Sequence, residues 1–412
     1  ETFLVEMPKD FEFYRKKLDN GVTVILEKRK TSAIALANSV KFGAQYENVN
    51  IKGISHFIEH LVFKGTKKRT VEEIPREIEN KGGIINAFTS EDITCYWNKL
   101  PRKHFRLGAD ISRDLILNPL FEKNALERER KVILEEIKMY NDNPTTYVLE
   151  KIKELLYKKP FNMSVAGTLE TVSSLSREKI IKLFNSIYTS NNVVFSVVGD
   201  IDWKDAVKEA KIFPKNKKEI SFVKIFLKNG KLIKKRKGID QAHLVLGFHM
   251  PKLNDKYRYA AEIFDSILGG GMSSKLFQEI REKRGLCYSV RSNLEQSRDY
   301  SYETIYVGTT KEKIIEVKKL ILKEIKKLKD LKQTELNEAK EKLIGLREIN
   351  KEKSELSMFE LLHEEIGGNA GNYYKYEENV DKVRLEDVRR LSKLNGYSFV
   401  VLVPEWKPTK LN

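Results

Sequence analysis

The sequence predicts an α+β fold made of two homologous layered domains in tandem, each a mostly antiparallel sheet packed with helices. Three observations favour this class. The 412 residues exceed one ordinary core, since a domain usually has about 150–250 residues. Matching segments recur at a constant offset along the chain. The expected strands are grouped with helices and do not alternate strictly with them, which is typical of α+β domains.

The repeat rests on two independent anchors. Gly65 and Gly270 each follow a predicted helix, and aligning them gives an offset of 205 residues. Aligning Val198 with Val403, each in an apolar strand that follows an amphipathic helix, gives the same offset. Two copies are too few for a solenoid, so a duplicated domain is the better interpretation.

The expected elements of the first copy follow in chain order. Residues 12–29 read as two strands around Asp19-Asn20-Gly21, a hairpin turn signal, and 32–42 reads as a third strand. The β-branched and aromatic residues of 82–100 predict a strand pair. Helices are expected near 53–64, 71–81, 102–117 and 122–142.

Pro214 and the basic stretch after it mark a boundary. We therefore predict domains at 1–212 and 238–412, joined by a basic linker at 213–237. The net charge of +17 would suit a nucleic-acid partner. Lysine and glutamate nevertheless alternate along 311–343, as on a solvated helix surface, so no nucleic-acid partner is expected. The charged content of 33% favours a heat-tolerant source.

Membrane and export signals are weak. No run of about 18 uncharged apolar residues occurs, so no membrane span or membrane partner is expected. Residues 1–10 lack the layout of a signal peptide, although a leader could have been removed before Glu1. Cys95 and Cys287 are far apart and suit a reducing compartment, so the expected location is cytoplasmic.

The segment "GISHFIEHLVFKG" (53–65) carries the strongest chemical signal. On a helix, His56, Glu59 and His60 share one face, because residues three and four apart are neighbours. A histidine bonded within the core is the alternative, but two imidazoles and a carboxylate are costly to bury without a partner. HxxEH is a known zinc-site pattern.

A catalytic zinc takes three protein ligands and keeps one open position. Glu129 and Glu136 lie two helical turns apart on one face of the helix expected at 122–142, whereas Glu127 and Glu135 point elsewhere. We expect Glu136 to be the third ligand and Glu129 to orient a histidine or Glu136 itself. An acidic surface face is the alternative for this pair.

Glu59 is then available for a different role. It lies too close in sequence to both histidines to be needed as a ligand, and a carboxylate beside the open position can transfer a proton. The sequence therefore predicts one Zn²⁺ per chain and metal-assisted hydrolysis of an amide. At the offset of 205, His56 and His60 correspond to Ala261 and Asp265, so the second copy is not expected to bind zinc.

With these residues assembled, the chain resembles the pitrilysin or inverzincin family of zinc metallopeptidases over nearly its whole length. It is similar to bacterial homologues of the mitochondrial processing peptidase. The resemblance rests on HFIEH (56–60), on Glu136 and the preceding Glu129, on "NAFTSED" (86–92), and on "GGGMSSKLFQEIREKRGLCYSV" (269–290). It implies a zinc metalloendopeptidase of the HxxEH type.

The resemblance implies further site residues. Asn86, Ala87 and Phe88 would form an exposed edge strand that binds the substrate backbone, although an ordinary buried strand is the alternative. Arg281 and Tyr288 match a catalytic Arg/Tyr pair that hydrogen-bonds substrate or the developing oxyanion, with Arg284 as the nearest competing assignment.

The implied function is hydrolysis of unfolded or short peptides in a closed chamber. The resemblance implies a homodimer in which Arg281 and Tyr288 of one chain complete the site of the other. A non-catalytic structural or chaperone-like peptide-binding subunit is the main alternative, since the family includes members that lack the chemistry. A subunit of a heterodimer is a third interpretation, which the presence of both half-sites disfavours.

Overall fold

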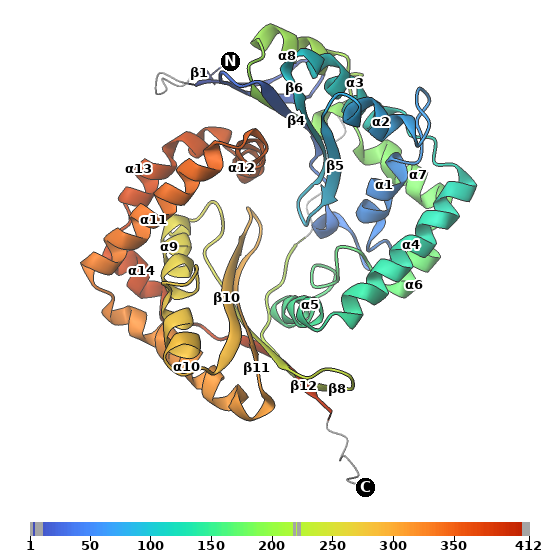
Figure 1. The fold of residues 1–412 in the computed structure, drawn as a ribbon. Coiled ribbons are helices and arrows are strands. Elements are labelled where there is room, and N and C mark those ends of the chain that lie inside the picture. The colour runs from blue at the N-terminus through green and yellow to red at the C-terminus, as the bar shows by residue number, and fades with distance from the viewer. Residues whose placement is uncertain (1–2, 5–10, 217–219, 221–223, 406–412) are drawn as a thin grey trace. The chain divides into compact units, whose positions relative to one another are not determined.

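The computed structural model describes residues 3–4, 11–216, 220 and 224–405 (Figure 1). The chain forms two compact units that are not simple halves of the sequence. Unit 1 comprises residues 1–137, 163–224 and 348–374, and unit 2 comprises 138–162, 225–347 and 375–412. Each unit is built around one sheet, and both sheets are mostly antiparallel.

Unit 1 contains a seven-stranded sheet in the order β1-β2-β3-β7-β4-β6-β5. Among the described strands of this sheet, β3 and β7 pair in parallel and the other neighbours pair antiparallel. Its strands are β1 (Phe3–Leu4), β2 (Glu12–Lys17), β3 (Thr23–Lys28), β4 (Ala33–Val40), β5 (Ile84–Thr89), β6 (Thr94–Pro101) and β7 (Val193–Gly199). Its helices are α1 (Ile54–Val62), α2 (Glu73–Glu79), α3 (Phe105–Leu117), α4 (Lys123–Asp142, in this unit as far as Ile137), α6 (Leu169–Ser174), α7 (Arg177–Ile187), α8 (Trp203–Lys211) and α12 (Ser354–Gly367).

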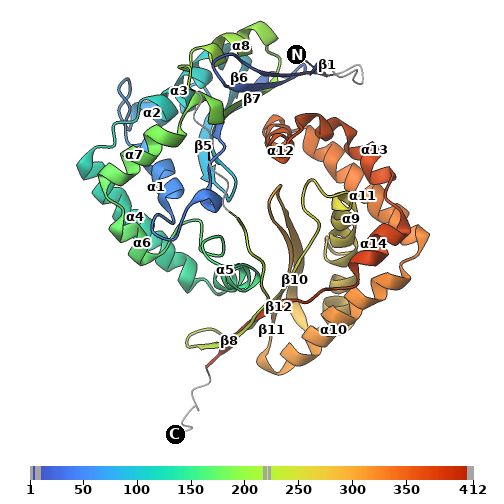
Figure 2. The same ribbon diagram turned by 180° about the vertical axis from the view of Figure 1, so that it is seen from behind.

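Unit 2 contains a five-stranded sheet in the order β10-β11-β9-β12-β8, and Figure 2 shows its helices α9, α10 and α14 along one side of the strands. In the part of this sheet that the structure describes, β12 and β8 pair in parallel and the other neighbours pair antiparallel. The strands are β8 (Lys231–Arg236), β9 (Ala242–His249), β10 (Cys287–Gln296), β11 (Ser301–Thr309) and β12 (Ser398–Pro404). The helices are α5 (Pro144–Leu156), α9 (Arg258–Leu268), α10 (Ile314–Lys327), α11 (Gln333–Lys351, in this unit as far as Arg347), α13 (Tyr376–Asp381) and α14 (Leu385–Leu391).

Two helices pack on a sheet from the other half of the sequence. α12 covers the face of the unit 1 sheet opposite α1 and α3, where Met358, Leu361 and Leu362 are buried against Ile25 and Val198. Its counterpart is α5, which comes from the first half of the chain and packs on β9 and β12 of unit 2. Each sheet is therefore covered on both faces only when the whole chain is present.

The fold class is confirmed, and the expected elements of the first copy occur in the predicted order. The predicted domains 1–212 and 238–412 differ from the compact units, because the segment 138–162 belongs to unit 2 and the segment 348–374 belongs to unit 1. Within the predicted linker 213–237, residues 231–236 form β8, and 217–219 and 221–223 lie outside the described residues. Across the described part of the chain, no helix is both long enough and apolar enough to cross a membrane.

Candidate metal centre

α1 carries His56, Glu59 and His60 on the face that points away from the hydrophobic core of unit 1. Its apolar residues are buried in unit 1 and alternate with polar residues at helical spacing. The buried apolar side chains of this helix are Ile54, Phe57, Ile58, Leu61 and Val62. The opposite face presents His56, Glu59 and His60, as the sequence pattern predicts.

Both ends of α1 are held in place by local contacts. At the start, the buried carboxylate of Glu47 accepts hydrogen bonds from the backbone N–H groups of Gly53 (2.9 Å) and Ser55 (2.7 Å). Gly53 has φ of 92°, and a Cβ there would lie 2.6 Å from the carbonyl oxygen of Ala166. Beyond the last turn, Gly65 has φ of 113° and turns the chain away. The helix therefore presents its polar face in a defined orientation.

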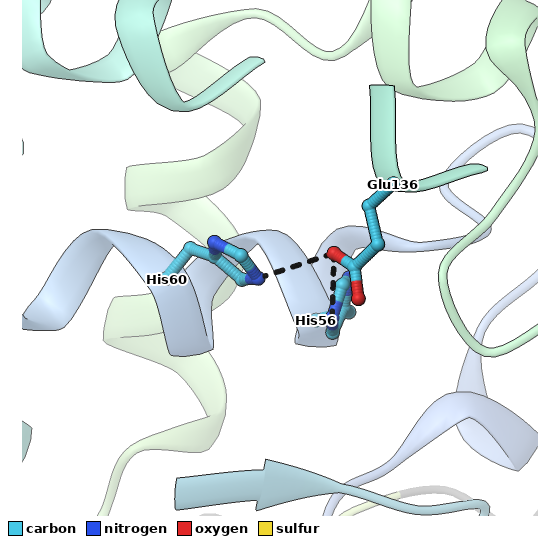
Figure 3. A group of neighbouring side chains, drawn as sticks. All are labelled: His56, His60 and Glu136. Carbon is cyan, nitrogen blue, oxygen red and sulfur yellow. Dashed lines mark ion pairs between the residues drawn. The ribbon is translucent and has the colours of Figure 1, made fainter. Parts of the chain in front are cut away.

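The structure brings His56, His60 and Glu136 together. The Nε2 atoms of His56 and His60 lie 3.7 Å and 3.6 Å from the same Oε2 atom of Glu136. Figure 3 shows the carboxylate reaching from α4 towards both imidazoles of α1. One ligand atom from each residue falls within 4.8 Å of the others, and no other such cluster occurs among the described residues.

The donor set fits zinc. Two imidazoles and one glutamate are a known ligand set of catalytic zinc, with the fourth position left open. The pKa of His56 is lowered to about 4, mainly by burial and to a smaller extent by the nearby His60. His56 is therefore neutral at pH 7 and offers a lone pair to a metal. Both nitrogens that face Glu136 are Nε2 atoms; among the described residues, Nδ1 of His60 has a hydrogen-bond partner and the buried Nδ1 of His56 has none.

Glu129 contacts His60, one of the two partners expected for it from the sequence. Its Oε2 lies 3.2 Å from Nδ1 of His60, and its side chain is nearly buried. Nδ1 donates in this bond, because a carboxylate oxygen accepts, and Nε2 is the ring nitrogen that faces Glu136. Glu127 and Glu135 are exposed on other faces of α4, as expected.

Sequence reasoning missed a residue next to Glu129. Nζ of Lys64 lies 2.9 Å from Oε1 of Glu129, so the two carboxylate oxygens have different partners. A signal was available, because Lys64 follows His60 by four positions and therefore lies near the same helical face.

Glu59 lies outside the cluster of three ligand atoms and has its own partner. The hydroxyl of Thr89 donates to Oε2 of Glu59 at 2.6 Å. Burial raises the pKa of Glu59, while the hydrogen bond from Thr89 acts in the opposite direction. Thr89 is the second residue that sequence reasoning missed, although it lies within the quoted segment 86–92. It ties the last residue of β5 to the helix that carries the histidines.

The strand that contains Asn86, Ala87 and Phe88 is at the edge of the sheet. Among the described strands β5 pairs with β6 alone, so one row of its backbone groups has no partner strand, although the Ala87 N–H bonds to Oδ1 of Asn86 at 2.8 Å. Asn86 is exposed, and Ala87 and Phe88 are half-buried, so the alternative of an ordinary buried strand does not hold. The Phe88 ring packs edge-on against Phe359 of α12, with ring centroids 5.6 Å apart.

Arg281 and Tyr288 belong to unit 2 and contact each other. The guanidinium of Arg281 lies 5.4 Å from the centroid of the Tyr288 ring. The pairing of β10 with β11 shifts between Cys287 and Ser289, so Tyr288 lies at a β-bulge. Its side chain is 78% exposed. Arg284 instead pairs with Glu279, which separates it from the Arg/Tyr pair.

Two protein-family models match this chain. The model described as "Insulinase (Peptidase family M16)" matches residues 22–169, and the model described as "Peptidase M16 inactive domain" matches residues 174–343. The chain belongs to peptidase family M16. The first M16 match contains all three residues of the metal cluster, together with Glu59 and Glu129.

Curated relatives and one solved structure are similar to this chain over most of its length. The uncharacterized zinc protease YmxG of Bacillus subtilis is 31% identical over 92% of this chain and 94% of that protein. An uncharacterized zinc protease of Rickettsia felis is 33% identical over 88% of this chain and 89% of its own length. A protease from Helicobacter pylori has the same fold, with a TM-score of 0.88, 22% identity, and coverage of 96% of this chain and 100% of that chain.

Proposed function

We propose that this M16 chain is a zinc-dependent endopeptidase of the HxxEH type that hydrolyses unfolded or short peptides. The observation that carries the proposal is the convergence of His56, His60 and Glu136, with Glu59 beside them and outside the ligand set. When bound, one Zn²⁺ per chain would act as a Lewis acid and make water nucleophilic at neutral pH.

The protein's own groups would do the rest. Glu59 holds a proton taken from the attacking water and delivers it to the leaving amine, and the hydroxyl of Thr89 keeps that carboxylate in place. The outer edge of β5 at Asn86, Ala87 and Phe88 binds an extended substrate as an added strand, and the substrate displaces Oδ1 of Asn86 from the Ala87 N–H. Recognition through the backbone gives a broad tolerance of substrate sequence.

Chelation tests the function directly. We expect the purified protein to contain one zinc per chain and to cleave an unstructured peptide, to lose cleavage after dialysis against a chelator, and to regain it with Zn²⁺. The measurements are elemental analysis and a fluorogenic peptide assay. Undiminished cleavage by the metal-free protein would contradict the proposal. Binding of zinc and peptide without any cleavage would favour the non-catalytic peptide-binding subunit instead.

We further propose a homodimer that encloses the substrate, in which Arg281 and Tyr288 of one copy hydrogen-bond the substrate at the zinc of the other. The exposure of Tyr288 at its bulge and its contact with Arg281 support this role. A cytoplasmic location belongs to the same proposal, since Cys95 and Cys287 are free thiols.

Mixing two inactive variants tests the shared site. Glu59→Gln and Tyr288→Phe chains are each expected to be nearly inactive alone. A mixed dimer keeps one complete site, so an equal mixture should recover about a quarter of the parental activity if chains exchange at random. The readout is peptide cleavage against mixing time, with size-exclusion chromatography to establish the dimer. Recovery no greater than the sum of the two variants would contradict sharing between chains.

A further inference from the structure

We propose that Lys64 is a positioning residue of the metal centre, acting on His60 through Glu129. This inference rests on the proposed function, because it concerns the same zinc site. The three side chains form a chain of contacts, called the relay below: Nζ of Lys64 lies 2.9 Å from Oε1 of Glu129, and Oε2 of Glu129 lies 3.2 Å from Nδ1 of His60.

The relay holds the carboxylate by both oxygens. With only the bond from His60, the Glu129 side chain could rotate about its terminal torsion, which is broad. The ammonium of Lys64 removes that freedom and leaves Oε2 directed at Nδ1. Groups that orient a metal-bound histidine in this way usually change metal affinity by about 10–100-fold when they are removed.

The position of Lys64 follows from the end of α1. The helix ends at Val62, and the backbone N–H of Lys64 still bonds to the carbonyl of Leu61 at 3.0 Å. This tighter i→i−3 turn continues the chain past the helix, and Lys64 reaches Glu129 from there. Gly65, with φ of 113°, then turns the chain away, so Lys64 is the last residue on the His60 side of α1.

The direction in which Zn²⁺ affinity changes when Lys64 is replaced distinguishes a positioning role from an effect of its charge alone. A lysine near a bound cation repels it, so loss of the positive charge alone would tighten Zn²⁺ binding. Loss of positioning would weaken it. We expect the second effect to dominate, because Glu129 and His60 are in direct contact whereas the Lys64 charge is two groups away and about a third of its side chain is exposed.

Metal affinity of four variants tests the inference. Zn²⁺ dissociation constants are measured by competition with a chromophoric chelator, and the d–d absorption of Co²⁺ reports the ligand geometry. We expect Lys64→Met to weaken Zn²⁺ binding about 10-fold and to alter the Co²⁺ spectrum, and Lys64→Arg to restore most of both. In a Glu129→Gln background, Lys64→Met should not weaken Zn²⁺ binding further, because the relay is already broken and only the charge effect, which acts in the opposite direction, remains.

The matched control is Lys68→Met. Lys68 lies in the same loop and pairs with Asp110 at 3.2 Å, so its loss removes an equal charge without touching the relay. Unchanged or tighter binding by Lys64→Met, or an equal effect of Lys68→Met, would overturn the inference. If the parent chain itself bound no zinc, the proposed function would fail first. Thermal unfolding of each metal-free variant shows whether the fold is intact.

Discussion

Glu59→Gln is expected to keep the metal and abolish hydrolysis. The substitution preserves the shape of the side chain, and the amide oxygen can still accept the bond from Thr89 that the carboxylate accepts at 2.6 Å. It removes the group that transfers the proton, and positioned acid–base catalysis contributes about 10²–10⁴-fold. We expect kcat to decrease by at least about 10²-fold, while the zinc content stays at the parental value.

Two measurements decide the outcome for Glu59. Zinc content and peptide cleavage are determined on the same preparation, with Glu135→Gln as the control because that side chain is exposed on α4. A Glu59→Gln protein that cleaves as fast as the parent would remove the assigned role. A protein that has lost its zinc would instead place Glu59 among the ligands.

Glu136→Gln is expected to release the metal itself. Oε2 of Glu136 is the atom on which both imidazoles converge, at 3.6 Å and 3.7 Å, and a neutral amide is a much weaker ligand for zinc than a carboxylate. The loss of affinity should exceed the roughly 10–100-fold that orienting groups cost, because a direct ligand is lost. Cleavage should disappear with the metal.

Thermal unfolding with and without Zn²⁺ provides the readout. A ligand present at 100 times its dissociation constant stabilises the folded protein by about 2.7 kcal/mol. The parent and Glu59→Gln should show this gain in the same zinc concentration, and Glu136→Gln should show almost none. An equal gain for Glu136→Gln would mean that zinc binds elsewhere. Glu135→Gln again serves as the control on the same helix.

The sequence was sufficient for the parts of the site that depend on local spacing. His56, Glu59 and His60 are on one helical face because of their spacing alone, and Glu129 and Glu136 are similarly related on α4. The pairing of the two helices was inferred from what zinc requires, and the structure brings the residues together as predicted. The contact of Glu136 with the two histidines was therefore inferred from the ligand requirement of zinc, because helical periodicity relates only residues of the same helix.

Other contacts could not be predicted from the sequence. The bond from Thr89 to Glu59 and the pair of Lys64 with Glu129 depend on how side chains from separate elements meet, and surface lysines and threonines carry no pattern that reveals it. The packing of α5 and α12 was missed for a similar reason. An apolar helical face shows that a helix is covered, but not which sheet covers it.

The exchange of helices has a consequence for how the protein can be cut. The polypeptide passes between the two units five times, so a protease acting within 213–224 would nick the backbone and leave four other connections. A fragment ending at residue 212 would lack Met358, Leu361 and Leu362, whose burial contributes about 1.5–3 kcal/mol each. That sum is a large share of the roughly 5–15 kcal/mol by which a typical domain is stable. The nicked protein should therefore elute as one particle, whereas the fragment made alone should aggregate.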